Sequence, residues 1–205
     1  MATALSQEAF DVLFRQARTY RNWLEKPVSD ELLLELYDLM KYGPTSDNCC
    51  PARILFLRTP QAKQRLLPAL SQGNVDKTMA APVTAIVGYD LKFFEQAAKL
   101  APHNPGAGDR FVKSPRLAET TAFRNGSMQG AYLILAARSL GLDCGPMSGF
   151  DNSKVDAEFF SAAAGNPPEF VDVKSNFLCN LGYGDASKLF PRNPRLTFDE
   201  ACRML

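Results

Sequence analysis

The chain has 205 residues, 46% of them hydrophobic, and its 23 basic side chains balance 22 acidic ones to a formal net charge of +1. This length and composition suffice for a hydrophobic core and exclude a disordered chain or a disulfide scaffold. A nearly neutral chain also lacks the positive charge that binding to nucleic acid or to an anionic membrane uses, so neither partner is expected.

Hydrophobic periodicity divides the chain into helices and short strands. Apolar residues spaced at i, i+3, i+4 and i+7 predict helices, and apolar or β-branched runs between turn residues predict strands. In chain order we expect a helix over 7–18, a helix that begins after Ser29 and stops at Gly43, a strand over 54–57, a helix over 60–70, a short helix capped by Asn74, a strand over 82–89, a helix over 91–100, a long helix over 117–140, a helix capped by Asp151 that runs to Phe160, a strand over 176–181 and a last short helix after a capping box from Thr197 to Glu200.

Two segments of this pattern bear on function. Residues 102–115 carry three prolines and two glycines with little periodicity, which predicts a loop or lid and the most mobile part of the chain. The long helix is apolar almost all round between Gly130 and Ala137, so it requires burial on several sides, at the centre of the fold or in a subunit interface, and the interface is favoured. Because helices and strands do not alternate regularly, an α+β architecture is favoured over a doubly wound sheet.

The N-terminus and the cysteine content bear on location. The first residues carry Glu8 and Asp11 and no basic region before an apolar run, unlike a targeting peptide. No apolar stretch reaches the ~20 residues that a membrane-spanning helix needs. Five cysteines without a C-x-x-C pair fit reduced thiols, so a cytoplasmic protein is expected.

His103 is the single histidine of the chain. It lies in a loop, where an exposed turn residue is a commoner explanation than a catalytic base, and the sequence has no ligand pair at the spacing of a zinc site. We therefore expect no metal and no metal-dependent hydrolysis. A cysteine hydrolase that pairs His103 with Cys49 or Cys50 stays open as an alternative of a different class.

Four clusters combine residue types that bind ligands. Residues 18–21 hold two arginines and a threonine at a helix end, a group that can bind phosphate but is more often a solvated surface. Residues 43–48 form a turn rich in backbone N–H groups and short hydroxyls. Asn74 and Lys77 share a helix face and can offer an amide and a cation to one planar ligand. The fourth cluster comprises Pro146, Met147, Ser148, Gly149 and Phe150, with Lys188, Arg192 and Arg195 near the C-terminus.

In this order the clusters resemble the FMN-dependent nitroreductase family, and the resemblance covers essentially the whole chain. The matching motifs are Arg18-Thr19-x-Arg21-x-Trp23, the turn Pro44-Thr45-Ser46-Asp47-Asn48 with Pro51, the pair Asn74 and Lys77, the turn with Pro146, Gly149 and Phe150, and the closing Arg192-Asn193-Pro194. Within the family the sequence is most similar to the malonic semialdehyde reductases of the Rut pathway of pyrimidine nitrogen use.

The resemblance implies one domain over 1–205 with a three-layer α+β fold, in which helices flank a mixed, mostly antiparallel sheet. It implies an intertwined homodimer with FMN at the subunit interface and NADPH or NADH as electron donor. Hydride would pass through the flavin in a ping-pong reaction that needs no catalytic side chain, and the implied reaction is reduction of malonic semialdehyde to 3-hydroxypropionate.

The family's cofactor contacts fall on defined positions of this sequence. Arg18, Arg21 and Arg192 would hold the phosphate, Lys77 and Asn74 the pyrimidine edge of the flavin, and the N–H of Gly149 would reach N5. The full implied set is Arg18, Thr19, Arg21, Pro44, Thr45, Ser46, Asn48, Asn74, Lys77, Pro146, Met147, Ser148, Gly149, Lys188 and Arg192. Substrate would meet slot walls at Phe111 and Phe123, and its carboxylate would meet Arg53, Arg124 or Arg110.

Several positions depart from the family pattern. Ala17, Cys50, Ala52, Ser148 and Phe190 stand where a basic residue, glutamine, tryptophan, glutamate and a basic residue are usual. These departures keep two alternatives open, a broad reductase of nitroaromatics and quinones, and a flavin-binding or storage protein without turnover. The choice between NADH and NADPH also stays open.

Overall fold

A computed structural model describes residues 3–205. The first two residues of the N-terminal stretch, which was compared with a targeting peptide, lie outside the described residues. Four strands, β1 (Ala52–Leu57), β2 (Val83–Asp90), β3 (Asp143–Met147) and β4 (Val173–Gly182), form one sheet in the order β1-β2-β4-β3. All three neighbouring pairs are antiparallel, and an isolated parallel bridge joins Thr19 to Cys144. The predicted α+β class with a mostly antiparallel sheet is confirmed.

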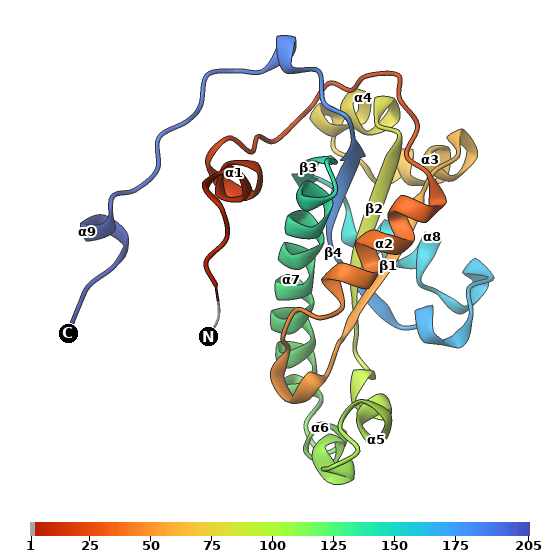
Figure 1. Ribbon diagram of the computed structural model, residues 1–205. Helices are drawn as coiled ribbons and strands as arrows, with labels where there is room; N and C mark the ends of the chain where they lie inside the picture. Colours follow the sequence, from red (N-terminus) through yellow and green to blue (C-terminus); the bar gives the residue numbers. More distant parts are fainter. Residues whose placement is uncertain (1–2) are drawn as a thin grey trace.

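Helices cover both faces of the sheet (Figure 1). One face carries α2 (Asp30–Met40) and α7 (Pro115–Ser139), and the other carries α3 (Pro60–Leu66), α4 (Gln72–Ala80) and α8 (Asn152–Phe159). Side chains alternate along the strands to fill both cores. On β2, for example, Val83, Ala85 and Val87 pack against α2 and α7, whereas Ile86 packs against α3 and α8. The three predicted layers are present.

The long helix α7 approaches the sheet closely because two of its residues are glycines. A Cβ atom on Gly130 would lie 2.4 Å from the ring of Phe177, and one on Gly126 would lie 2.9 Å from Cβ of Tyr89. Within one chain the stretch 130–137 buries only part of its surface, since Leu133 is fully buried and Ala131 is exposed. Its predicted place in a subunit interface stays a prediction.

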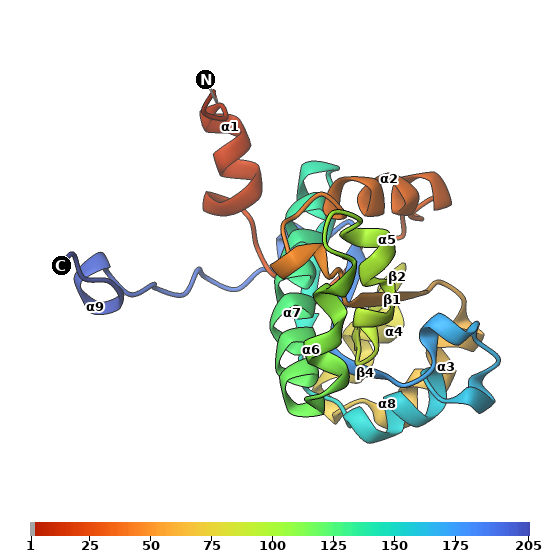
Figure 2. The same cartoon turned by 90° about the horizontal axis from the view of Figure 1, so that it is seen from below.

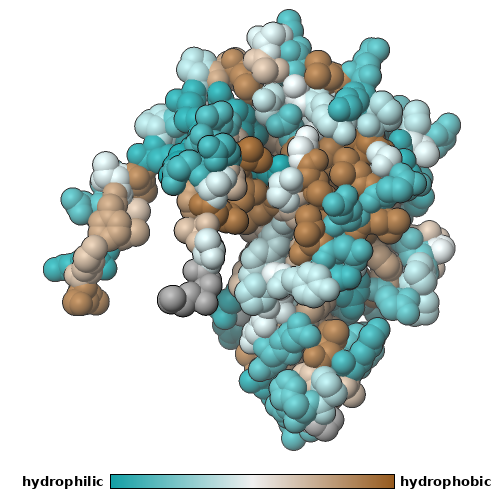
Figure 3. All heavy atoms as spheres, in the orientation of Figure 1, coloured by the Kyte–Doolittle hydropathy of each residue, from teal (hydrophilic) through white to brown (hydrophobic). Residues whose placement is uncertain are grey.

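Both ends of the chain extend away from these layers (Figures 1 and 2). The N-terminal arm contains α1 (Gln7–Phe10), continued by a π-helical turn over Asp11–Arg15, and the C-terminal arm ends in α9 (Phe198–Ala201). The capping box of Thr197 and Glu200 is present as predicted. Figure 3 shows apolar side chains over α2 and along the C-terminal arm. No helix within residues 3–205 is long and apolar enough to cross a membrane.

Several details of the predicted elements differ from the structure. The first helix ends at Arg15 rather than Arg18. Ser71 precedes α4 at the N-cap position, so Asn74 lies inside this helix instead of capping it. The helix expected over 91–100 is divided into a 3-10 turn over Phe93–Gln96 and α5 (Ala97–Leu100). The segment 102–115 is partly helical, since it contains a 3-10 turn over 105–108 and α6 (Asp109–Val112).

Strand β3 has no counterpart in the sequence prediction. Gly145 and Pro146 are poor strand formers, and proline lacks the N–H that a central strand requires. The strand is possible because β3 is the last strand of the sheet: it pairs along its length with β4, and on its other side Thr19 bridges to Cys144, so Pro146 needs no N–H there. It ends at Met147, so β3 leads directly into the motif around Gly149.

Candidate functional site

A cavity of about 940 Å³ lies between the N-terminal arm and the segment that leads to the C-terminal arm. It brings together five predicted cofactor residues, Arg18, Thr19, Arg21, Lys188 and Arg192. Three further cations line it, namely Arg195 of the fourth sequence cluster and Arg15 and Arg138, which sequence reasoning missed. Seven cationic side chains thus face one cavity, and among its lining residues in the described part of the chain there is no carboxylate. Such a cavity is suited to an anion with more than one charge.

Backbone contacts orient two of these cations. Nη2 of Arg18 donates to the carbonyl of Phe190 over 2.5 Å, and Nη2 of Arg192 donates to the carbonyl of Ala17 over 2.9 Å. The guanidinium of Arg21 lies 5.5 Å from the centre of the Phe190 ring. Because each guanidinium has five N–H groups, these contacts leave donors free to bind phosphate oxygens.

A second group of predicted residues meets where α4 packs beside the end of β3. Nδ2 of Asn74 donates to the carbonyl of Gly149 over 2.6 Å, and the backbone N–H of Ser71 donates to the same oxygen over 3.0 Å. A Cβ atom on Gly149 would lie 2.5 Å from Nδ2 of Asn74, so a side chain at this position would displace the amide. Burial, and then the nearby Arg21 cation, lower the pKa of Lys77. Arg21 lines the cationic cavity, whereas Lys77 is not among the lining residues.

The rest of the Pro146 motif has a structural environment. Pro146 is in the edge strand, and Met147 is buried and accepts a weak hydrogen bond from Thr78 over 3.5 Å. Ser148, which replaces a glutamate of the family pattern, is exposed.

The predicted turn over residues 44–48 is anchored on α7, and it is not among the residues that line the cationic cavity. Asn125 Oδ1 accepts from the N–H of Ser46 over 2.8 Å, and the Tyr132 hydroxyl donates to the carbonyl of Pro44 over 2.9 Å. Asp47 and Asn48 both have φ of 51°, a left-handed conformation that costs energy for residues other than glycine. One chain therefore does not bring Pro44, Thr45, Ser46 and Asn48 together with the phosphate-binding candidates.

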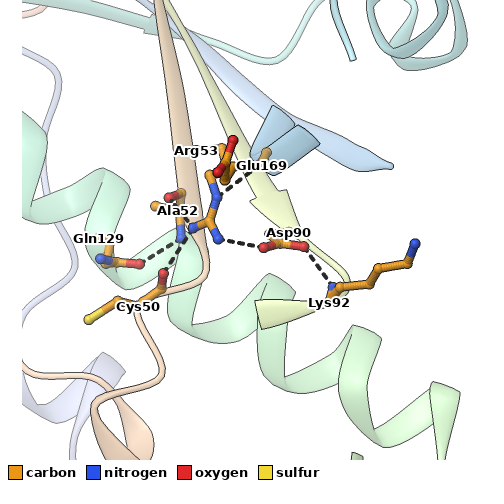
Figure 4. A network of polar contacts seen from close by, with 7 residues as sticks. All are labelled: Cys50, Ala52, Arg53, Asp90, Lys92, Gln129 and Glu169. Atoms are coloured by element: carbon orange, nitrogen blue, oxygen red, sulfur yellow. Dashed lines mark hydrogen bonds and ion pairs between the residues drawn. The ribbon is translucent and has the colours of Figure 1, made fainter. Parts of the chain in front are cut away.

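Arg53, a predicted substrate contact, is half-buried and makes most of its hydrogen bonds to protein groups (Figure 4). Its Nη2 lies 2.5 Å from Oδ2 of Asp90, its Nε donates to the carbonyl of Glu169 over 3.1 Å, and its Nη1 donates to the carbonyls of Cys50 and Ala52. Burial raises the pKa of Asp90, and the Arg53 cation opposes this rise without cancelling it. The guanidinium consequently has little capacity left for a substrate carboxylate.

The other two candidate arginines differ in whether a protein carboxylate already pairs with their charge. Arg110 pairs with Asp47. Arg124 is exposed on α7 and forms no ion pair within residues 3–205. Of the three arginines, Arg124 has the charge most available to a ligand.

The two predicted aromatic slot walls also differ. Phe111 is buried against Phe93, with ring centres 4.8 Å apart, in a cluster that includes Cys49. Phe123 is 50% exposed and meets Tyr89 edge to face at 5.6 Å. Only Phe123 has a surface free to line a slot in this chain.

The geometry gives the cysteine-hydrolase alternative no support. Burial raises the pKa of the Cys49 thiol to about 11, which keeps it protonated and unreactive near neutral pH. Among the hydrogen bonds of the described residues, none joins His103 to Cys49 or Cys50. All five cysteines are free thiols, and residues 3–205 contain no cluster of potential metal ligands.

Residues 14–173 match the Nitroreductase family, and the chain belongs to that family. Over 201 residues it is 54% identical to a protein of Cupriavidus pinatubonensis named as an NADH dehydrogenase/NAD(P)H nitroreductase, an alignment that covers 97% of this chain and 98% of the relative. The predicted family is therefore confirmed, whereas the malonic semialdehyde reductase branch stays a prediction.

Solved structures of the same fold support the architecture. A nitroreductase from Bacillus subtilis superposes with a TM-score of 0.80 at 20% identity, covering 98% of this chain and 100% of the other. A nitroreductase from Exiguobacterium sibiricum, determined in complex with FMN, superposes with a TM-score of 0.77 at 16% identity, covering 100% of both chains. The nitroreductase fold of this chain is thereby established.

Proposed function

We propose that this protein is an FMN-dependent NAD(P)H oxidoreductase. The observation that carries the proposal is the cavity lined by seven cations and no carboxylate, beside the site formed by Asn74, Lys77 and Gly149. A relative of 54% identity is named for NAD(P)H, and a structure of the same fold contains FMN. The NAD(P)H in the relative's name and the FMN in the solved structure both fit an anion-binding cavity next to a site for a planar ring.

The residues present fit FMN in charge and in hydrogen-bonding groups. Arg18, Thr19, Lys188 and Arg192 would bind the phosphate, whereas Asn74 and Lys77 would face the polar edge of the ring. The carbonyl of Gly149 holds Asn74 at 2.6 Å, so this amide is oriented before the cofactor arrives. FMN, when bound, supplies the hydride-accepting ring that couples a nicotinamide donor to a second substrate.

The protein's own contribution is charge and position. Lys77 is near Arg21 and partly desolvated, so both gain from a neighbouring anion, and the site favours a flavin that becomes more negative on reduction. No side chain of the site has to act as a nucleophile. Catalysis of this kind depends on how rigidly the residues hold ring and substrate together.

We further propose that two copies form the complete site. The turn over 44–48 does not line the cationic cavity of its own chain. Large apolar side chains border that cavity or extend along the arms while remaining exposed, with Phe14 56%, Phe190 67% and Leu196 70% accessible. A second copy that packs against the arms would bury these residues and bring its turn to the flavin.

For the second substrate we propose malonic semialdehyde, reduced to 3-hydroxypropionate. Its carboxylate needs a cationic partner, and Arg124 is exposed and unpaired within the described residues. The competing candidate is a nitroaromatic compound or quinone, which the name of the 54% identical relative favours. Comparison of kcat/KM for the aldehyde and a nitroarene separates the two, and a nitroarene preferred by orders of magnitude would reject the aldehyde.

The test of the proposed function is an anaerobic visible spectrum of the protein reconstituted with FMN. We expect stoichiometric NADPH or NADH to bleach the flavin absorbance, and malonic semialdehyde to restore it. Bleaching without reoxidation by the aldehyde would retain the oxidoreductase and remove this substrate. Failure of both donors to bleach a bound flavin would instead favour the storage alternative.

A further inference from the structure

Two side chains from distant parts of the sequence converge on one backbone carbonyl, that of Lys77. The indole Nε1 of Trp23 donates to this oxygen over 3.0 Å, and Nδ2 of Asn180 donates to it over 3.1 Å. Lys77 lies in the last turn of α4, where the carbonyl groups have no N–H partner within the helix. Trp23 and Asn180 therefore fix the end of the helix that carries Lys77.

The amide of Asn180 is held in one orientation. Thr84 on β2 donates its hydroxyl to Oδ1 of Asn180 on β4 over 2.8 Å, and the two residues are direct partners in the sheet. Both side chains are completely buried. Because Oδ1 accepts from Thr84, Nδ2 is directed at the carbonyl of Lys77. A fully paired buried network of this kind defines a single geometry.

The backbone of the segment around Trp23 is also held in place. Its segment pairs with the end of the sheet, where the N–H of Tyr20 donates to the carbonyl of Cys144 over 3.1 Å and Trp23 bridges to Gly184. A Cβ atom on Gly145 would lie 2.6 Å from the carbonyl of Tyr20. The absence of a side chain at Gly145 thus creates the space in which this segment rests.

The convergence has a consequence for the proposed flavin site. Trp23 is two residues beyond Arg21, so its bond to Lys77 joins the cationic cavity to α4. The same helix carries Asn74, whose amide is held by Gly149 at 2.6 Å. One helix is thus fixed at both ends, by Gly149 near its start and by Trp23 and Asn180 near its finish.

We propose that Trp23 and Asn180 are positioning residues, which hold the Lys77 carbonyl and thereby place the Lys77 cation against the flavin ring. The inference rests on the proposed function. A fixed cation beside the ring binds the more negative reduced flavin more tightly than the oxidised form. Loosening either donor should therefore reduce the preference for reduced FMN, even though neither side chain carries a charge.

The experiment measures the dissociation constants of oxidised and reduced FMN for the wild-type protein and for Lys77→Met, Trp23→Phe, Asn180→Leu and Thr84→Val. Lys77→Met should lose about tenfold of the preference for reduced FMN, because a cation at a few ångströms is removed. Trp23→Phe keeps the aromatic ring and removes only the N–H, and it should lose at least about threefold, since the Lys77 carbonyl is left with one of its two donors.

The variants separate positioning from general loss of stability. Thr59→Ala removes the N-cap of α3, a hydrogen bond of 3.1 Å to the N–H of Ala62, and should lower Tm without changing the ratio of the two dissociation constants. If Asn180→Leu fails to fold, Thr84→Val releases the same amide with almost no change in volume and carries the test.

The outcomes distinguish the inference from the function. An unchanged ratio in Trp23→Phe and Thr84→Val, with an altered ratio in Lys77→Met, would overturn the positioning role and leave the proposed function intact. An unchanged ratio in Lys77→Met would overturn it as well. A wild-type protein that binds neither form of FMN would refute the function and the inference together.

Discussion

Arg18 and Arg192 brace each other's segments across the cationic cavity. Arg18 donates to the carbonyl of Phe190, two residues before Arg192, and Arg192 donates to the carbonyl of Ala17, next to Arg18. The two ends of the chain are thus joined by the same guanidinium groups that face the cavity. Their orientation before a ligand arrives reduces the side-chain ordering that phosphate binding would otherwise require.

Arg192→Gln should weaken FMN binding by about 10- to 100-fold, because a hydrogen bond to a charged group contributes about 1.5–3 kcal/mol. The measurement is a titration of the apoprotein with FMN, in which quenching of the flavin fluorescence reports binding. Arg116→Gln is the matched control, since Arg116 is exposed on α7 and does not line the cavity. Equal affinities in the two variants would show that Arg192 does not bind the phosphate.

A pair of glycine substitutions on neighbouring elements tests the Asn74 site. Gly149→Ala would place Cβ 2.5 Å from Nδ2 of Asn74, and it should displace the amide, cost about 1–3 kcal/mol of stability and weaken FMN binding. Gly73→Ala, within α4, has no atom within 4 Å of the new Cβ and should stabilise the protein by about 0.5–1 kcal/mol with unchanged FMN affinity. Chemical denaturation and FMN titration of both variants check these expectations. A Gly149→Ala protein with normal FMN affinity would contradict the assigned role of Asn74.

The sequence predicted elements whose signals are local. Ser29 caps α2 and Asp151 caps α8, each accepting a hydrogen bond from a backbone N–H of the first turn, and the Glu200 carboxylate accepts from the backbone N–H of Thr197. Such signals depend on residues within one turn, so they can be read without knowledge of the rest of the fold.

Elements that depend on distant partners were missed. Strand β3 exists because β4 pairs with it, although Gly145 and Pro146 oppose a strand locally. The segment expected to be a mobile loop is helical in part because Phe111 is buried against Phe93. Arg138 joins the cavity from the end of α7, and no local pattern indicates that this helix end lies beside Arg18.

The Arg53–Asp90 pair gives a prediction about pH. Arg53→Met leaves the Asp90 carboxylate buried without its cation, and should destabilise the protein by about 3–5 kcal/mol at pH 7. Burial already raises the pKa of Asp90, and loss of Arg53 raises it further. Such a carboxyl does not affect stability below its unfolded pKa of about 3.9, where it is protonated in both states. As pH rises above that value the folded state loses stability, and the full loss is present above the folded pKa.

The destabilisation caused by Arg53→Met should therefore shrink as pH falls from 7 towards 4. Urea denaturation of wild type and variant across this range provides the measurement. The exposed Arg65→Met change, which breaks a surface pair with Glu158, is the control and should cost about 1 kcal/mol or less at pH 7. A deficit for Arg53→Met that stays constant with pH would mean that Asp90 is not the source of the cost.

Arg124 is the remaining candidate for recognition of a substrate carboxylate, because Arg53 is bound to Asp90 and Arg110 is bound to Asp47. Arg124→Gln should raise KM for malonic semialdehyde by about tenfold or more through loss of a charge-assisted hydrogen bond, with kcat less affected. For an uncharged nitroarene the same variant should retain its KM, since that substrate has no carboxylate to lose. Steady-state kinetics with both substrates, and with Arg116→Gln as the charge-matched control on the same helix, make the comparison. A KM that rises equally for the two substrates would point to a damaged slot rather than a lost ionic contact, and a KM unchanged for both would remove Arg124 from the substrate site.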